Sequence, residues 1–356
     1  MGCRRVDTMA VHPPRRDQRT RSFEDHSYSR GILTLTAIRR WKLAFRLVIV
    51  ALVIYGVWRT LGDAADQFAQ YDFRWSALGH RWLLAAGLAY LAGMLPCWWF
   101  WHRVLQAMGG RPLRRQTLCA FYVGHLGKYV PGKAMVVVIR TALIRGPRVD
   151  TAVAAVSVFV ETLTMMAIGA LVAAGLLLTI SDESWLFWLA VALFGLAGFP
   201  TLPPVFRRAV RAVGVQRSNP QLEKAISALR LPVLATGWVV IAGGWFLMGA
   251  SLWAVLKAMP IASVTASAAG MSGFQTTALL TATVALAMVA GFLSLLPGGI
   301  GVRELVVVTL LAPVYGEVDA ILSAVLLRVI WLIAELVASG CLYLVARPRR
   351  EPDTVT

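Results

Sequence analysis

The chain has 356 residues, of which 58% are hydrophobic and only 15% are charged, and its mean hydropathy is +0.67. A soluble domain rarely reaches these values, and several apolar runs extend to about 20 residues, the length that crosses ~30 Å of hydrocarbon. The formal net charge of +17 would suit a nucleic-acid-binding protein, but Lys and Arg also collect on the cytoplasmic side of membrane proteins. Composition therefore predicts an all-α polytopic membrane protein.

The two ends of the chain are polar. Residues 1–40 are basic, and they are too long and too charged for the n-region of a signal peptide, so we expect a disordered cytoplasmic tail. Residues 41–346 form the single predicted transmembrane domain, and residues 347–356 form a short second cytoplasmic tail. The four cysteines show neither a disulfide framework nor metal-ligand spacing, so no metal or other cofactor is expected.

Six segments are apolar enough and long enough to be transmembrane helices. They are Leu43–Leu61, Trp82–Trp101, Thr151–Ile180, Trp185–Val205, Val233–Leu256 and Ala320–Ala346. An N-terminus on the cytoplasmic side places most Lys and Arg residues in cytoplasmic segments, as the positive-inside rule requires. The charge distribution thus predicts a protein of the inner (cytoplasmic) membrane with both termini in the cytoplasm, and it argues against nucleic-acid binding.

The first interruption of an apolar segment is at residues 127–133, Gly-Lys-Tyr-Val-Pro-Gly-Lys, within Leu118–Ile139. A bilayer cannot solvate a free backbone or a bare charge, so such a break is tolerated only where it lines a cavity or packs against other helices. Arginines assigned to the cytoplasm flank the segment on both sides. We therefore predict a re-entrant hairpin that enters and leaves on the cytoplasmic side, with its turn at Tyr129–Gly132.

The second interruption is at residues 297–304, Pro-Gly-Gly-Ile-Gly-Val-Arg-Glu. Proline ends a helix and glycine lets the backbone reverse, so we predict a hairpin over Thr276–Val314 that dips in from the opposite face, with its turn at Pro297–Gly301. The arm Leu305–Val314 is too short to cross alone, whereas the arm Thr276–Leu296 is long enough to span. The residues that form the two backbone breaks are Pro131, Gly132, Pro297, Gly298, Gly299 and Gly301.

Six transmembrane helices plus two re-entrant broken-helix hairpins make up the predicted fold. Broken helices that enter from opposite faces are typical of an inverted repeat with a binding site near the midplane of the bilayer. The two halves do not align by residue identity, so the inverted repeat is a hypothesis that rests on topology.

Ionisable side chains inside the predicted membrane domain each need a partner or a function, because each costs about 2.5–3.5 kcal/mol at the centre of a helix. They are Lys128, Lys133, Glu161, Arg303, Glu304, Arg328 and Glu335. One interpretation is mutual neutralisation that holds the bundle together, as Arg328 and Glu335 could achieve from one helical face. The other is that basic groups bind a phosphate with the help of helix N-termini, and it favours Lys133 and Arg303, which follow glycines.

Nucleotide hydrolysis is not expected. Residues 127–133 match most of a P-loop, but Ala134 replaces the Ser or Thr that binds magnesium, and no strand precedes the run. Movement of a ligand would then be passive or coupled to an ion gradient. His125, beside the first break, either makes a satisfied polar contact or relays a proton.

The two broken motifs, in this order, resemble those of the lysylphosphatidylglycerol synthase transmembrane family. Residues 127–132 look like its Gly-Lys-Tyr-x-Pro-Gly segment, residues 297–304 look like its Pro-Gly-Gly-x-Gly-x-Arg-Glu segment, and Arg328 sits where the family tends to carry an arginine. The resemblance covers roughly residues 40–346. The family includes the flippase half of the multiple peptide resistance factor and members tied to hopanoid transport, so it implies movement of a lipid across the bilayer.

The resemblance also implies which side chains lie near the lipid path. The residues expected at the lipid headgroup are Lys128, Lys133, Arg140, Arg303 and Arg328. The residues expected to act as charge partners or in coupling are Glu161, Glu304 and Glu335.

Two departures from the family pattern are visible. The third span carries Glu161-Thr162 where members often have an acidic residue followed by arginine, and Ala134-Met135 stand where an aromatic residue is common. The substrate is therefore expected to differ. Synthase members add a soluble aminoacyltransferase domain, and the printed chain ends ten residues after its last predicted span. We expect a stand-alone member without synthase activity.

The predicted function is binding and translocation of an anionic phospholipid or a polyprenyl phosphate through a basic midplane cavity. The alternative is a membrane enzyme or accessory subunit that acts on lipid-linked sugars. Glycosyltransferases of that kind usually hold a metal with an acidic cluster, and the outside candidates Asp63, Asp66 and Asp72 contain no paired Asp-x-Asp. A homo-oligomer or a second membrane protein are the macromolecular partners considered.

Overall fold

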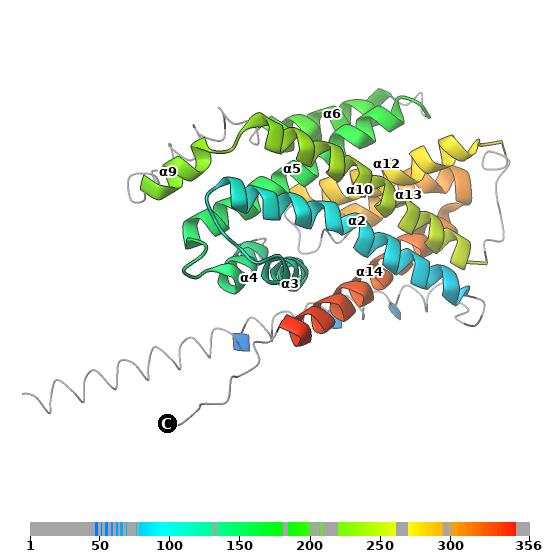
Figure 1. Ribbon diagram of the computed structural model, residues 1–356. Helices are drawn as coiled ribbons and strands as arrows, with labels where there is room; N and C mark the ends of the chain where they lie inside the picture. The colour runs from blue at the N-terminus through cyan, green and yellow to red at the C-terminus, as the bar shows by residue number, and fades with distance from the viewer. Residues whose placement is uncertain are drawn as a thin grey trace, which may run out of the picture. The chain divides into compact units, whose positions relative to one another are not determined.

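The structure, a computed structural model, describes residues 78–130, 134–180, 184–199, 220–260, 270–294, 299 and 301–346, with scattered positions elsewhere. Its labelled elements are helical (Figure 1). In chain order they are α2 (His80–Ala107), α3 (Arg114–His125), the short 3-10 helix η2 (Leu126–Tyr129), α4 (Ala134–Ile144), α5 (Thr151–Leu177), α6 (Ser184–Gly198), α9 (Pro220–Ser227), α10 (Leu231–Ala258), α12 (Gly273–Leu293), α13 (Val302–Tyr315) and α14 (Glu317–Ala346).

Five of these helices, α2, α5, α10, α12 and α14, are long and apolar enough to cross a membrane. Four of the five coincide with predicted spans, which confirms the all-α, polytopic class within the described residues. Helix α6, at the predicted span Trp185–Val205, has only 15 residues. The predicted span Leu43–Leu61 lies largely outside the described residues, so the count of six spans stays a prediction.

Local sequence signals explain where two of the long helices begin. Asp150 precedes α5, and its carboxylate accepts hydrogen bonds from the backbone N–H groups of Ala152 and Val153. Ser272 precedes α12 and forms a reciprocal capping box with Gln275. These side chains satisfy N–H groups that the first turn of a helix leaves unpaired.

Helices α2 and α10 pack along one another at a contact between glycines. A Cβ atom at Gly93 would lie 2.9 Å from the carbonyl oxygen of Gly244, and one at Gly244 would lie 2.6 Å from that of Gly93. Ser251 on α10 also donates a hydrogen bond of 2.8 Å to the carbonyl of Ala86 on α2. Small residues and interhelical hydrogen bonds of this kind let transmembrane helices approach closely.

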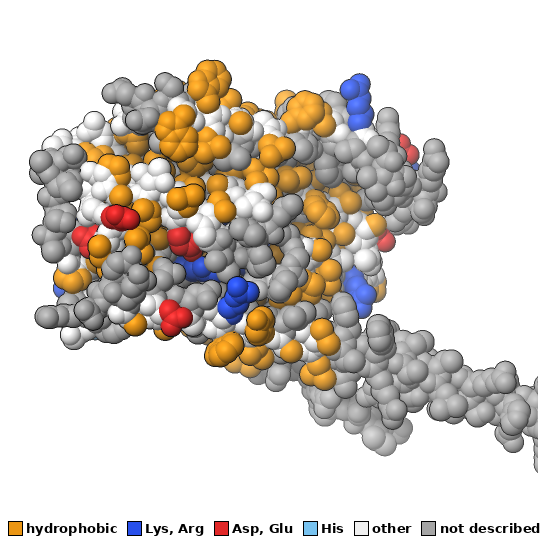
Figure 2. Space-filling view, turned by 180° about the vertical axis from the view of Figure 1, so that it is seen from behind, with side chains coloured by type: hydrophobic (Ala, Val, Ile, Leu, Met, Phe, Trp, Pro, Cys, Tyr) orange, Lys and Arg blue, Asp and Glu red, His pale blue; other side chains and the backbone are white. Residues whose placement is uncertain are grey.

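Outward-facing apolar side chains cover the long helices. Figure 2 shows hydrophobic side chains spread over a broad face, with basic and acidic side chains at separate positions across it. The exposed large hydrophobic residues include Leu84 and Leu88 of α2, Val239 of α10, and Ile333 and Val337 of α14. Apolar exposure on this scale is what lipid tails cover in a membrane protein.

The first broken segment folds as a pair of short helices, α3 and α4, joined through η2. We call Arg111–Arg148 the first hairpin. Its two ends meet, because the backbone N–H of Arg111 donates a 2.9 Å hydrogen bond to the carbonyl of Arg148. Helices of 12 and 11 residues are each too short to cross the hydrocarbon core alone. Residues 131–133 of the predicted turn are not among those described.

The second broken segment joins α12 to α13, which pack together. Gly299 and Gly301 have φ angles of +71° and +83°, a left-handed conformation that glycine adopts without strain. Pro297 and Gly298 fall outside the described positions. Helix α12, predicted as one arm of a hairpin, has 21 residues and is itself long enough to span, whereas α13 has 14. The predicted dip is therefore not confirmed.

Helix α14 brings the two broken segments together. It contacts α13, which follows the second break, and α3 of the first hairpin, and it also contacts α2 and α10. Side chains from η2, α12, α13 and α14 consequently converge on one place.

Candidate functional site

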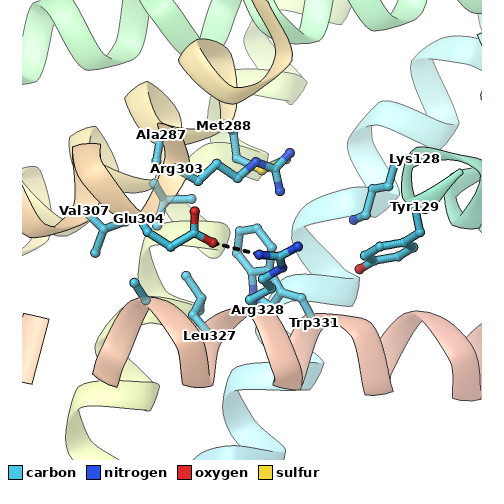
Figure 3. Close-up of a pocket in the computed structure, with 12 residues that line it drawn as sticks. Lys128, Tyr129, Ala287, Met288, Arg303, Glu304, Val307, Leu327, Arg328 and Trp331 are labelled. Atoms are coloured by element: carbon cyan, nitrogen blue, oxygen red, sulfur yellow. Dashed lines mark hydrogen bonds and ion pairs between the residues drawn. The ribbon is translucent and has the colours of Figure 1, made fainter. Parts of the chain in front are cut away.

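A cavity of about 540 Å³, counted with its open mouth, lies where these elements converge (Figure 3). Its walls mix apolar side chains with three basic groups and one acidic group. The lining residues are Lys128, Tyr129, Val284, Ala287, Met288, Arg303, Glu304, Val307, Ala324, Leu327, Arg328 and Trp331. The charged lining residues described thus carry a net positive charge within an apolar enclosure.

Arg303 enters the cavity from the first turn of α13. Its side chain lies against two glycines: a Cβ atom at Gly291 would be 2.6 Å from Arg303 Cγ, and one at Gly299 would be 2.9 Å from Arg303 Nε. The buried Nε has no hydrogen-bond partner, and no carboxylate among the described residues lies within 4.0 Å of the guanidinium. Figure 3 shows the guanidinium directed into the cavity, where its donors can reach a ligand.

Arg328 on α14 pairs with Glu304 on α13. Arg328 Nη1 lies 3.0 Å from Glu304 Oε1, and the two side chains are 16% and 21% exposed. Glu304 Oε2 also accepts a 2.8 Å hydrogen bond from the backbone N–H of Gly301, which ties the carboxylate to the start of α13. Arg328 Nη2 has no partner among the described residues, so Arg328 keeps a donor for a ligand.

Lys128, at the tip of the first hairpin, pairs with the buried carboxylate of Glu335 on α14. The hydroxyl of Tyr90 on α2 donates to the same carboxylate oxygen. The Lys128 ammonium lies 5.1 Å from the ring centroid of Tyr129 and 5.9 Å from that of Tyr90. The predicted balance between Arg328 and Glu335 is wrong, since each pairs with a residue from another element.

Arg140 belongs to a second, closed cluster and does not line the cavity. It is 1% exposed, and its Nη1 lies 2.6 Å from Glu161 Oε2. Its guanidinium also stacks over Phe121, with Cζ 4.2 Å from the ring centroid. Thr162 donates a 3.2 Å hydrogen bond to the same oxygen of Glu161. Arg140 is therefore the charge partner of Glu161.

His125 lies between the closed cluster and the Lys128–Glu335 pair. Its Nδ1 is 3.4 Å from Arg140 Nη2, and its Nε2 is 4.0 Å from Glu335 Oε1. A guanidinium can only donate, so Nδ1 accepts and the neutral ring carries its proton on Nε2. This contact supports the polar-contact interpretation of His125.

The structure brings Lys128, Arg303, Glu304 and Arg328 of the predicted site together, with Glu335 behind Lys128. It places Arg140 and Glu161 elsewhere, and Lys133 falls in a stretch it does not describe. Sequence reasoning missed the aromatic residues Tyr90, Tyr129 and Trp331. Tyr129 lies inside the first motif and Trp331 lies one helical turn from Arg328, so their positions beside predicted site residues could have identified them. Nothing in the sequence singles out Tyr90.

Together, the helices and the cavity define a polytopic membrane protein with a basic, partly apolar site. A family model for the lysylphosphatidylglycerol synthase TM region matches residues 35–339. The chain therefore belongs to this family of membrane proteins, as the two broken motifs predicted. The comparison with curated proteins returned no match.

Proposed function

We propose that the protein binds the phosphate of a membrane lipid in this cavity and moves the lipid from one leaflet to the other. The observation that carries the proposal is that the guanidinium of Arg303 has no carboxylate partner among the described residues. A cation held in an apolar setting is costly unless an anion accompanies it. A lipid phosphate supplies that anion and arrives through the bilayer.

The positions of the other groups support a phosphate near Arg303. Arg328 lines the same cavity with a free donor, and the N-terminus of α13 adds the positive end of a helix dipole. Apolar residues such as Val284 and Leu327 line the rest of the cavity. A phosphate could thus sit among the arginines while the acyl or prenyl chains stay in the bilayer.

The proposed architecture has six spans and two broken hairpins that enter from opposite faces, with both termini in the cytoplasm. The meeting of Arg111 with Arg148 supports the first hairpin, and the short α13 supports the second. Cysteine labelling at Val130 and Ile300 tests this arrangement. We expect slow, restricted labelling at both positions, whereas full-rate labelling from one side at either position would contradict a re-entrant hairpin there.

In the proposed mechanism, one half of the bundle rocks against the other and exposes the headgroup to each leaflet in turn. The ion pairs that join elements from the two broken segments, such as Arg328 with Glu304, are the contacts that such a motion would remake. Movement is passive or coupled to an ion gradient through Glu161, Glu304 or Glu335.

The test is leaflet exchange in liposomes that contain purified protein and acyl-labelled phosphatidylglycerol or a labelled polyprenyl phosphate. Arg303→Gln should slow exchange of the true substrate at least about tenfold, the factor that corresponds to 1.4 kcal/mol. Arg303→Lys keeps the charge, and Arg145→Gln removes an exposed arginine away from the cavity, so both serve as controls.

Unchanged exchange by folded Arg303→Gln protein would overturn the proposed headgroup site. A preference for one labelled lipid would separate a phospholipid substrate from a polyprenyl phosphate. Sugar transfer by the purified protein, without leaflet exchange, would favour the alternative of an enzyme acting on lipid-linked sugars.

A further inference from the structure

The carboxylate of Glu335 on α14 is enclosed by ionisable groups from the helices packed around it. Its Oε1 accepts hydrogen bonds from the Lys128 ammonium and the Tyr90 hydroxyl, and it lies 4.0 Å from His125 Nε2. Helix α10, which also contacts α14, carries a single ionisable residue, Lys257, in its last turn. The ionisable groups that face Glu335 from other elements are Tyr90 of α2, Tyr122 and His125 of α3, and Lys128 and Tyr129 of η2.

The second oxygen of Glu335, Oε2, is buried and has no hydrogen-bond partner among the described residues. Glu304 differs, because its Oε1 pairs with Arg328 and its Oε2 accepts from the backbone N–H of Gly301. A proton can therefore attach to Oε2 of Glu335 without displacing a hydrogen bond that the carboxylate already makes. Acidic residues buried within membrane domains commonly mark the paths and binding sites of protons.

Lys128 connects this carboxylate to the cavity. Lys128 is 15% exposed and lines the cavity, whereas Glu335 is 1% exposed and does not. Figure 3 shows the Lys128 side chain directed toward the space that Arg303 and Arg328 also border. The ammonium thus has two alternative anionic partners, which are Glu335 behind it and a lipid phosphate bound at the arginines.

The charge on Glu335 determines which of these partners the ammonium prefers. A proton on Glu335 removes the negative charge that holds Lys128, so the ammonium becomes available to the phosphate. Conversely, a phosphate beside Lys128 offsets the positive charge that otherwise opposes protonation of Glu335. Because coupling between two binding events is reciprocal, the proton and the lipid phosphate each strengthen the binding of the other.

We propose that Glu335 is a proton-binding site, and that one proton crosses the membrane together with each lipid phosphate. The inference rests on the proposed lipid translocation and adds the ion that drives it. A phosphodiester carries one negative charge, so the proton cancels the charge that the lipid would move. The movement is then driven by a pH gradient and is insensitive to the membrane potential.

The test uses purified protein in phosphatidylcholine vesicles with acyl-labelled phosphatidylglycerol and an imposed pH gradient. Valinomycin and equal potassium concentrations abolish the membrane potential, and protein-free vesicles give the background. The labelled lipid should collect in the leaflet that faces the alkaline side, because protons moving down their gradient carry it there. At one proton per lipid, each pH unit supports a leaflet ratio of up to about tenfold. A membrane potential imposed at equal pH should leave the wild-type distribution unchanged.

Glu335→Gln imitates the protonated carboxyl group, because glutamine still accepts from the Tyr90 hydroxyl and leaves Lys128 to the phosphate. This variant should exchange the lipid without responding to the pH gradient. A membrane potential should now move the lipid toward the positive side, since it crosses as an anion. Glu317→Gln removes an exposed carboxylate from the first turn of the same helix, so it serves as the matched control and should keep the wild-type response.

A double variant guards against misfolding of Glu335→Gln, which leaves the Lys128 ammonium without its carboxylate. Lys128→Gln/Glu335→Gln leaves neither charge unpaired, and it should likewise ignore the pH gradient. The gradient response of the wild type tests the coupling without any substitution.

The outcomes distinguish the inference from the proposed function. Exchange by the wild type with an equal distribution under the pH gradient would overturn proton coupling and leave translocation intact. Accumulation that persists in folded Glu335→Gln, or that disappears in Glu304→Gln, would overturn the assignment to Glu335. Exchange by the wild type at the protein-free rate, with no gradient imposed, would overturn translocation of this lipid and with it the inference.

Discussion

Arg140 and Arg303 both follow a helix break, yet they end in different surroundings. Arg140 is 1% exposed, has Glu161 Oε2 at 2.6 Å and lies over the ring of Phe121. Arg303 lines a cavity, and no carboxylate of the described residues lies within 4.0 Å of it. A cation whose charge is neutralised inside the protein holds helices together, whereas one with unused donors at a cavity is available to a ligand.

The side chains of both arginines pack against glycines. A Cβ atom at Gly124 would collide with the side chain of Arg140, and one at Gly291 would lie 2.6 Å from Arg303 Cγ. Close packing against a glycine therefore accompanies both Arg140, which is paired with Glu161, and Arg303, which lines the cavity. Substitutions in the two regions should separate an effect on stability from an effect on transport.

The largest expected effect is on stability and follows Arg140→Ala. The variant leaves the carboxylate of Glu161, which is 1% exposed, without its cation. Breaking a buried pair in this way costs about 3–5 kcal/mol. We expect a sharp loss of folded protein in detergent, measured as the monodisperse yield and the thermal unfolding temperature.

The control for this prediction is the double variant Arg140→Met/Glu161→Leu, which replaces the whole pair by apolar side chains. Such replacement is often neutral or stabilising, so this variant should recover most of the lost stability. If it also recovers lipid exchange, the closed cluster is structural. Loss of exchange in a well-folded double variant would instead place Glu161 or Arg140 in the coupling.

An intermediate effect, on transport rather than stability, is expected for Gly291→Ala. The added methyl group meets Arg303 Cγ and Nε at 2.6 and 2.8 Å, and the arginine can yield because its far end faces an open cavity. Exchange of the anionic lipid should fall about fivefold, corresponding to about 1 kcal/mol of lost binding. Leaflet exchange and thermal unfolding, measured together, check the prediction.

Two matched alanine substitutions sharpen this comparison. Gly124→Ala presses on Arg140, which is pinned by Glu161 and cannot move aside, so it should cost about 1–3 kcal/mol of stability. Gly243→Ala adds a methyl group where no atom lies within 4 Å, and it should change neither stability nor exchange appreciably. Equal behaviour of Gly124→Ala and Gly291→Ala would remove the distinction between the two arginines.

The sequence predicted the helices better than the ion pairs. Continuous hydrophobicity located α2, α5, α10 and α14, because the length of an apolar run sets whether a helix can span. Pairing depends on which helices become neighbours, which spacing along one helix does not reveal. Arg328 and Glu335 share a face of α14, but Arg328 pairs with Glu304 from α13 and Glu335 pairs with Lys128 from η2.

The same limit explains why the sequence predicted only part of the candidate site. The glycine and proline breaks favoured Lys133 and Arg303 as phosphate-binding groups; Arg303 lines the cavity, and Lys133 lies outside the described residues. The family resemblance added Lys128, which lines the cavity, and Arg140, which does not, because its buried partner Glu161 lies on another helix, 21 positions along the chain. Tyr90 is 38 positions from Lys128 and looks like any other aromatic residue of an apolar span.

The smallest expected effect follows Glu304→Gln. The pair with Arg328 is partly exposed, so its loss should cost about 1 kcal/mol of stability or less, and glutamine can still accept from the N–H of Gly301. The substitution frees Arg328 and removes the one negative charge among the described lining residues. Exchange of the anionic lipid should therefore rise, by about fivefold at most, and the gain should shrink as salt screens the site. If exchange falls instead at every salt concentration, Glu304 either holds Arg328 in place or takes part in coupling. The Arg328–Glu304 pair at the cavity would then play a structural role like that of the Arg140–Glu161 pair.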